Sequence, residues 1–61
     1  MNTDNQLRAI YALYMKDGLS YSELTDITNW AERAGPLFDT TVLTEKSRER
    51  ITAIFRRFYK D

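Results

Sequence analysis

The chain has 61 residues, with nine basic and nine acidic side chains, a formal net charge of zero, and neither cysteine nor histidine. A chain this short forms at most one domain with a marginal core, because folding removes only about 60% of its unfolded surface from water. The missing residue types exclude disulfides, thiolate and imidazole metal sites, histidine general bases and cysteine nucleophiles. We therefore expect a single domain over residues 1–61, with no metal and no cofactor.

Charge, aromatic content and the N-terminal sequence set the expected class of partner. Zero net charge argues against a protein that coats nucleic acid by charge alone. Four tyrosines, three phenylalanines and one tryptophan suit a dense core or a partner subunit, so a homodimer is expected. The start, MNTDNQLRAI, has no basic segment before an apolar run, and no apolar stretch approaches the roughly 20 residues of a membrane span. These features predict a cytoplasmic protein without a membrane segment.

The first predicted helix covers residues 4–16. Thr3 and Gln6 have the spacing of a capping box, and Asp4 is placed to favour the positive end of the helix dipole. The Asp-Gly pair at 17–18 supplies the stop. An apolar stripe at helical spacing covers about 200° of the helix, so we expect this helix to contact more than one neighbour. The stripe consists of Leu7, Ile10, Tyr11, Leu13, Tyr14 and Met15.

The second predicted helix covers residues 21–34. Ser20 and Glu23 form a second capping box, and Gly35-Pro36 ends the helix because glycine accepts a left-handed turn and proline cannot continue. Trp30 lies at the edge of the buried face. That face consists of Leu24, Ile27, Ala31 and Ala34.

The third predicted helix covers residues 45–60 and starts after Thr44, with an apolar stripe on one side. We therefore predict an all-α domain, a helical hairpin followed by a third helix. The predicted core consists of Leu7, Ile10, Tyr14, Leu24, Ile27, Ile51, Ile54, Phe55 and Phe58.

The connector between the second and third helices, GPLFDTTVLT, is more apolar than a solvated loop should be. One interpretation is that its apolar side chains cap the open end of the core as a packed loop. The other is that Leu37 and Phe38 form part of a partner-binding surface. Tyr21 and Tyr59 are further candidates for partner contact, because each lies at the margin of its helical stripe.

Basic residues gather on one ridge of the third helix. Such a ridge offers about three phosphate contacts, enough for weak and salt-sensitive nucleic-acid binding. The alternative is a solvated face, in which cations complement the helix dipole and Glu45 and Glu49 pair with Arg48 and Lys46. The possible nucleic-acid contacts are Lys46, Arg50, Arg57 and Lys60, with Arg56 to one side.

Catalysis has little support in the sequence. The acidic residues are scattered and the serines have no candidate base beside them. We expect no enzymatic activity, no catalytic residue and no small-molecule substrate.

Two segments resemble the helix-turn-helix in region 4 of bacterial sigma factors. DGLSYSELTDI, residues 17–27, is similar to the first half of that motif, and TEKSRERI, residues 44–51, is similar to its basic recognition helix. In that family a turn of three to four residues separates the two helices. Here two arrangements remain open. Either Asn29 takes a left-handed turn and WAERA becomes a stub of recognition helix, or an unbroken second helix is followed by the third.

The whole chain, starting at MNTDNQLRAIYALYMKDG, resembles the small early-region regulatory proteins of lambdoid phages in size and helical character. The resemblance implies a non-enzymatic regulator that is made during prophage induction and influences lytic development by binding host or phage proteins. We therefore expect a protein-interaction regulator. The alternative is a helix-turn-helix DNA-binding transcriptional regulator that uses the basic third helix.

Overall fold

The structure, a computed structural model, describes residues 2–13 and 18–59, and all regular structure in these two stretches is helical. Three α-helices, α1 (Thr3–Tyr11), α2 (Tyr21–Ala34) and α3 (Glu45–Phe58), are joined by a connector that contains the short 3-10 helix η1 (Thr40–Val42). The predicted all-α three-helix fold is confirmed. No helix in the described stretches is long and apolar enough to cross a membrane.

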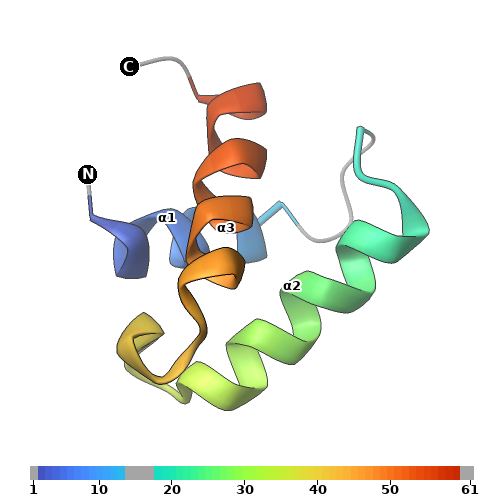
Figure 1. Cartoon of the computed structure of the whole chain (residues 1–61). Coiled ribbons are helices and arrows are strands. Elements are labelled where there is room, and N and C mark those ends of the chain that lie inside the picture. The colour runs from blue at the N-terminus through green and yellow to red at the C-terminus, as the bar shows by residue number, and fades with distance from the viewer. Residues whose placement is uncertain (1, 14–17, 60–61) are drawn as a thin grey trace.

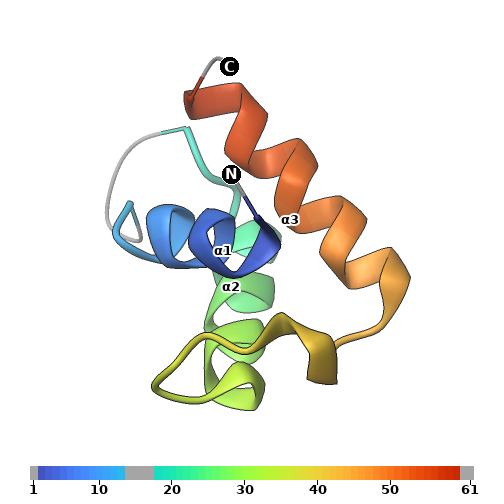
Figure 2. The ribbon, with the colours of Figure 1, turned by 90° about the vertical axis from the view of Figure 1, so that its left-hand side faces the viewer.

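The helix α1 lies across α2 and α3, and the connector passes under it from the end of α2 to the start of α3 (Figures 1 and 2). It contacts α2, α3 and η1, as its broad apolar stripe predicts. The core forms at this crossing and includes Leu7 and Ile10 of α1, both fully buried. Its other buried apolar members are Ile27, Trp30, Ala34, Leu43, Ile51, Ile54 and Phe55.

Three predicted core residues differ from this set. Leu24 is only half-buried, because it lies at the border between the core and the outward side of α2. Phe58 is also half-buried and packs against the core from the end of α3. Tyr14 lies outside the described residues. Trp30, predicted at the edge of the buried face, is instead buried.

The predicted capping box at the start of α1 is wrong. Asn2 is the N-cap, and its side chain accepts a hydrogen bond from the Asn5 N–H at 2.9 Å. Gln6 is buried, and its side-chain oxygen accepts a hydrogen bond from the Thr52 hydroxyl of α3 at 2.6 Å. The Gln6 side chain therefore bonds to Thr52 and does not close a capping box with Thr3. Thr3 is instead the first residue of the helix.

The end of α1 comes at Tyr11, earlier than predicted. The Leu13 N–H donates to the Ile10 carbonyl at 3.0 Å, a bond that tightens the last turn into 3-10 geometry. The Tyr11 ring packs on Phe38 of the connector with ring centroids 5.9 Å apart. Leu13 thus lies beyond the helix. The stripe residues Tyr14 and Met15 lie outside the described residues.

The helix α2 has the predicted bounds and the predicted caps. The Glu23 N–H donates to the Ser20 hydroxyl, and the Glu23 carboxylate accepts from the Ser20 N–H at 2.9 Å. Gly35, with a φ of 80°, ends the helix. The helix is unbroken through Asn29, so the stub of recognition helix is wrong and the uninterrupted second helix is right.

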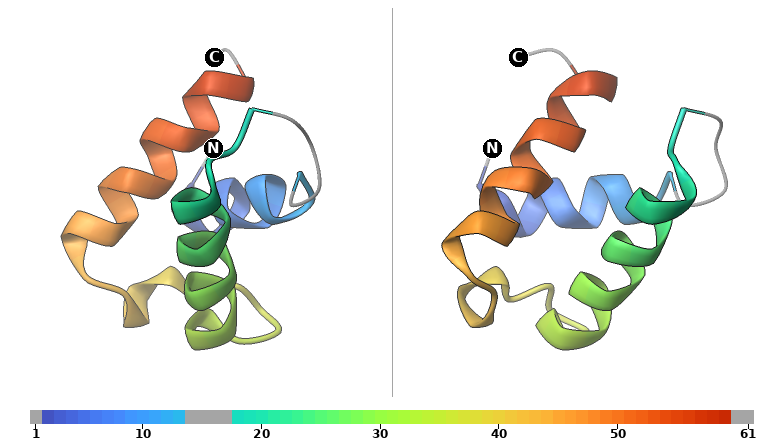
Figure 3. Two further views of the ribbon diagram at one scale, coloured as in Figure 1. Left: turned by 90° about the vertical axis from the view of Figure 1, so that its right-hand side faces the viewer. Right: turned by 45° about the vertical axis from the view of Figure 1, so that its right-hand side comes forward.

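The helix α3 begins after Thr44 as predicted, and its C-terminal end lies beside the segment that leads into α2 (Figure 3). Gly18, predicted to stop the first helix, follows the end of α1 by several residues and instead touches α3. Its φ is 103°, and a Cβ at this position would lie 3.1 Å from the Phe58 ring. The Gly18 carbonyl accepts a hydrogen bond from Arg57 at 2.6 Å. Gly18 therefore holds the entry of α2 against α3.

Candidate partner-binding surface

One side of α2, which runs from the exposed Tyr21 past half-buried positions to Gly35, carries almost no charge. We call it the outer face and define it by its residues, Tyr21, Leu24, Thr25, Thr28, Ala31, Glu32 and Gly35. These positions recur at three- and four-residue spacing and share one side of the helix. Glu32 is the one residue among them that is charged at neutral pH. The face therefore offers a partner mainly apolar contact.

Two threonines on the outer face turn their polar atoms inward. The Thr25 hydroxyl donates to the Tyr21 carbonyl at 3.1 Å, and the Thr28 hydroxyl donates to the Leu24 carbonyl at 2.9 Å. Each hydroxyl thus has a partner within its own helix. What these two residues present to the outside is chiefly their methyl groups, so the centre of the outer face behaves as an apolar surface.

A hollow of about 360 Å³ lies at the C-terminal end of the outer face. Its lining comes from α1, α2 and the connector. The Phe38 ring forms part of the wall, half-buried, with Tyr11 on one side and the Arg8 guanidinium 4.8 Å from its centroid. The lining residues are Tyr11, Thr28, Ala31, Glu32, Gly35, Pro36 and Phe38.

The opposite end of the outer face carries a protruding side chain. Tyr21, the first residue of α2, is 86% exposed. A smaller depression continues from it along the helix past Thr25 to Thr28, which also lines the hollow at the far end. Projection and hollow thus lie on one continuous surface.

The connector combines both interpretations that its sequence left open. Leu43 is buried and Phe38 packs against the core, as a loop that caps the core requires. Leu37 is 79% exposed and Val42 is also exposed, so part of the apolar connector does face outward. Tyr59 lies apart, at the end of α3, where it stacks on Phe55 with ring centroids 4.9 Å apart.

A hydrogen bond network ties the connector to α1 and α3. Asp4 of α1 accepts from the Thr40 N–H at 2.9 Å and from the Thr40 hydroxyl. These hydrogen bonds lower the pKa of the Asp4 carboxyl below its ordinary value. Arg48 of α3 donates to the Leu43 carbonyl at 2.8 Å, so it holds the connector rather than pairing with the glutamate predicted for it.

Two residues of the predicted basic ridge are occupied by contacts to α2. Arg50 lies 3.0 Å from an Asp26 carboxylate oxygen and packs over Trp30. Arg57 makes a two-pronged contact with the Glu23 carboxylate, at 2.6 and 2.9 Å. Lys60 lies outside the described residues. The remaining two, Lys46 and Arg56, are exposed.

The ion pair between Glu23 and Arg57 shifts the pKa values of both groups. Hydrogen bonds from Arg57 and from the Ser20 backbone lower the pKa of Glu23 to about 2. The carboxylate in turn raises the pKa of Arg57. This pair joins the first turn of α2 to the last turn of α3, so it fixes the orientation of α2 from the side opposite the outer face.

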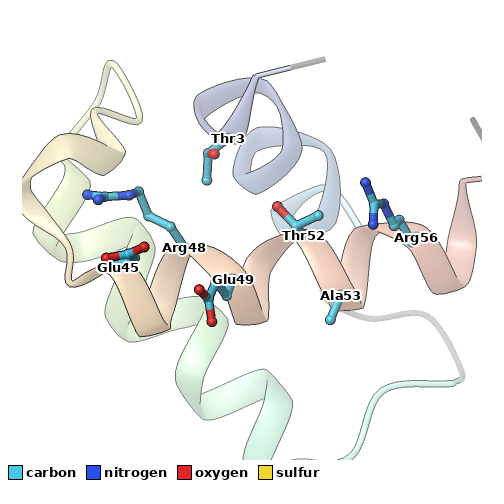
Figure 4. Close-up of a pocket in the computed structure, with 7 residues that line it drawn as sticks. All are labelled: Thr3, Glu45, Arg48, Glu49, Thr52, Ala53 and Arg56. Carbon is cyan, nitrogen blue, oxygen red and sulfur yellow. The ribbon is translucent and has the colours of Figure 1, made fainter.

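A second hollow, of about 500 Å³, lies along α3 beside the start of α1. Figure 4 shows Glu45 and Arg48 together at one end of it, Glu49 in the middle and Arg56 at the other end. The charges alternate in sign along the helix, so the hollow has no net preference for an anion. Among the described residues, no group of acidic side chains is placed to hold a metal ion.

Searches of protein-family models, of curated proteins and of solved structures find no match to this chain. Its fold and surface therefore define the class to which we assign it, a small three-helix domain with a nearly uncharged helix face.

Of the candidate partner residues, the structure brings Tyr21 and Phe38 to one surface and leaves Leu37 and Tyr59 outside it. Sequence reasoning missed Thr25, Thr28 and Glu32. A usable signal was present, because Tyr21, Thr25, Thr28 and Glu32 follow the four- and three-residue steps of a single helix side.

Proposed function

We propose that this chain is a small non-enzymatic regulatory protein that acts by protein–protein interaction through the outer face of α2. The observation that carries the proposal is the exposed, nearly uncharged surface between Tyr21 and Phe38. An apolar groove on a helix of rigid orientation suits the docking of an amphipathic helix from a partner. Nucleic acid would find few cations there.

The resemblance to the early-region proteins of lambdoid phages gives the proposal a setting. It supports a phage-encoded, cytoplasmic protein that influences lytic development by binding a host or phage protein. The regulator needs no reaction of its own in this setting, because binding to a partner is sufficient to change that partner's activity.

The competing function is DNA binding through α3, favoured by the exposed Lys46 and Arg56 and by the likeness to sigma factors. Arg50 and Arg57 weigh against it. Both lie in ion pairs with α2 carboxylates, so a DNA phosphate would have to displace Asp26 or Glu23. A duplex would thus meet fewer available cations than the sequence alone predicts.

One matched pair of variants tests the proposal. Thr28→Arg places a charge at the centre of the outer face, whereas Ser22→Arg places the same charge about a third of a turn away on the same helix. We expect affinity capture from a host lysate to recover a partner with the unmodified chain and with Ser22→Arg, and to lose it with Thr28→Arg.

Titration of the chain against random duplex DNA tests the competing function. Duplex binding at physiological salt that is kept in Thr28→Arg and lost in Arg56→Ala would contradict the proposal in favour of DNA binding. Such binding should fall steeply as salt rises.

A further inference from the structure

The outer face of α2 is complementary to itself. Tyr21 projects at one end and the hollow at Gly35 opens at the other, and each lies seven residues from Thr28. Both are therefore about 10 Å from Thr28 along the helix axis. If two copies pack antiparallel with Thr28 on the two-fold axis, Tyr21 of each copy comes opposite Gly35 of the other.

We propose that a second copy of this chain occupies the outer face, as a symmetric antiparallel dimer in which each Tyr21 fills the other copy's hollow. This inference rests on the proposed function, because the second copy covers the same protein-binding surface in the free protein and a host or phage partner binds there by displacing it. A two-fold interface requires one patch that matches itself, and the equal spacing of projection and hollow meets that requirement.

The direction of the Tyr21 side chain supports the match. Side chains on a helix lean toward its N-terminus, so the Tyr21 ring reaches beyond the start of α2. In the antiparallel pair, this direction leads past Gly35 of the other copy toward Pro36 and Phe38, which line the hollow. Glu32 also lines it, and its carboxylate can accept a hydrogen bond from the tyrosine hydroxyl.

The centre of the face allows close approach. Thr25, Thr28 and Ala31 are small, and the threonine hydroxyls are already bonded to their own helix. The two helix axes can therefore come within about 8 Å, the short end of the range for packed helices.

The charge pattern permits the same arrangement. The two Glu32 side chains are separated by about 12 Å along the axis, which exceeds the screening length of about 8 Å at physiological salt. A parallel pair fits worse, because it would place both Tyr21 rings at one end and both hollows, unfilled, at the other.

Single-cysteine variants test this geometry, since the chain has no cysteine of its own. Thr28→Cys should form a disulfide-linked dimer on mild oxidation, because the two positions meet at the axis. Tyr21→Cys alone should not, because its two copies lie about 21 Å apart. A mixture of the Tyr21→Cys and Pro36→Cys variants should form a dimer with a disulfide between the two different variants. The Ser22→Cys variant measures how much cross-linking arises from random collision.

Sedimentation equilibrium measures the association itself. The unmodified chain should give twice the 7.2 kDa chain mass at high concentration, Tyr21→Ala should weaken the dimer about tenfold, and Thr28→Arg should be monomeric with unchanged helicity. The inference would be overturned if Thr28→Cys cross-links no more than Ser22→Cys, or if Tyr21→Cys cross-links to itself. A chain that stays monomeric at millimolar concentration would also overturn it.

The same variants separate this inference from the proposed function. An unmodified chain that is monomeric, yet captures another protein that Thr28→Arg loses, refutes the symmetric dimer and leaves the interaction function standing. A monomer that captures no protein in either form refutes both.

Discussion

The inner and outer sides of α2 belong to the same helix and are built in different ways. On the inner side, Ile27 and Trp30 enter the core, and Glu23 and Asp26 pair with arginines of α3. On the outer side, the hydrogen bonds of Thr25 and Thr28 stay within the helix. One side is bound to the rest of the fold, and the other is left for contacts that the single chain does not make.

This difference would keep the proposed binding surface rigid in a very small domain. Contacts on the inner side fix the orientation of α2, so the outer side needs no internal partner to hold its shape. Binding there then requires little ordering of the chain, which lowers the entropy cost of association.

The largest loss of stability is expected from a change in the core, which supports both sides of α2. Ile54 is 4% exposed in the core, and Ile54→Ala should lower the free energy of unfolding by about 2–4 kcal/mol. A domain this small has little stability to lose, so much of the chain should unfold. Circular dichroism that shows unchanged helicity and melting temperature would contradict the packing described above.

A smaller effect is expected from the pair that joins α2 to α3. Arg57→Ala removes the two-pronged contact to Glu23 and the bond to the Gly18 carbonyl. The Arg57 side chain is 46% exposed, so solvent screens the pair and the loss should be about 1 kcal/mol. Chemical denaturation measures it. An equal loss in Lys46→Ala, which removes an exposed cation of the same helix, would show that general charge is responsible rather than this contact.

The same pair predicts a pH dependence of stability. The pKa of Glu23 is lowered from 4.5 to about 2 in the folded chain, so the folded state favours the ionised carboxylate. Its contribution is complete above pH 4.5 and is lost as the pH falls toward 2. The stability difference between the unmodified chain and Glu23→Gln should therefore shrink over this range. A difference that stays constant would contradict the ion pair.

A local effect is expected where α1 holds the connector. Asp4→Asn weakens the acceptor of the Thr40 N–H and hydroxyl, so amide exchange at Thr40 should accelerate while exchange in α2 is unchanged. Hydrogen exchange followed by nuclear magnetic resonance measures both sites. Acceleration throughout α2 would mean that the connector supports the whole fold rather than one end of it.

The smallest effect on stability is expected on the outer side. Thr28→Arg should change the free energy of unfolding by only about 0.5 kcal/mol, because Thr28 lies half-buried at the rim of the hollow and its hydroxyl bonds only within α2. Thermal melting of dilute protein measures this. A loss of several kcal/mol would show that Thr28 supports the fold and would remove the distinction between the two sides of α2.

Sequence reasoning succeeded where the signals were local. The bounds of α2 follow from the Ser20 and Glu23 capping box and from Gly35, all of which act within a few residues. The start of α1 was predicted wrongly because Gln6 has a better partner in Thr52, 46 positions away. The early end of α1 goes with the 3-10 hydrogen bond from the Leu13 N–H to the Ile10 carbonyl, and no local sequence signal marks this position.

The candidate surface was predicted only in part for the same reason. The exposure of Tyr21 followed from its position at the margin of a stripe. The hollow is formed by three segments that only the folded chain brings together, and the threonine hydroxyls turn inward by a choice of rotamer. The basic ridge was overestimated because the carboxylates that occupy Arg50 and Arg57 lie on another helix.

The central claim is that the outer side of α2 is a binding surface for a second copy, and amide chemical shifts followed during dilution test it most directly. Between millimolar and micromolar concentration, we expect shifts at Tyr21, Thr28 and Glu32 to change together along one binding curve. The core amides of Ile51 and Ile54 should stay unchanged. Shifts that do not change on dilution, or that change along Lys46 and Arg56 of α3 instead, would contradict this account.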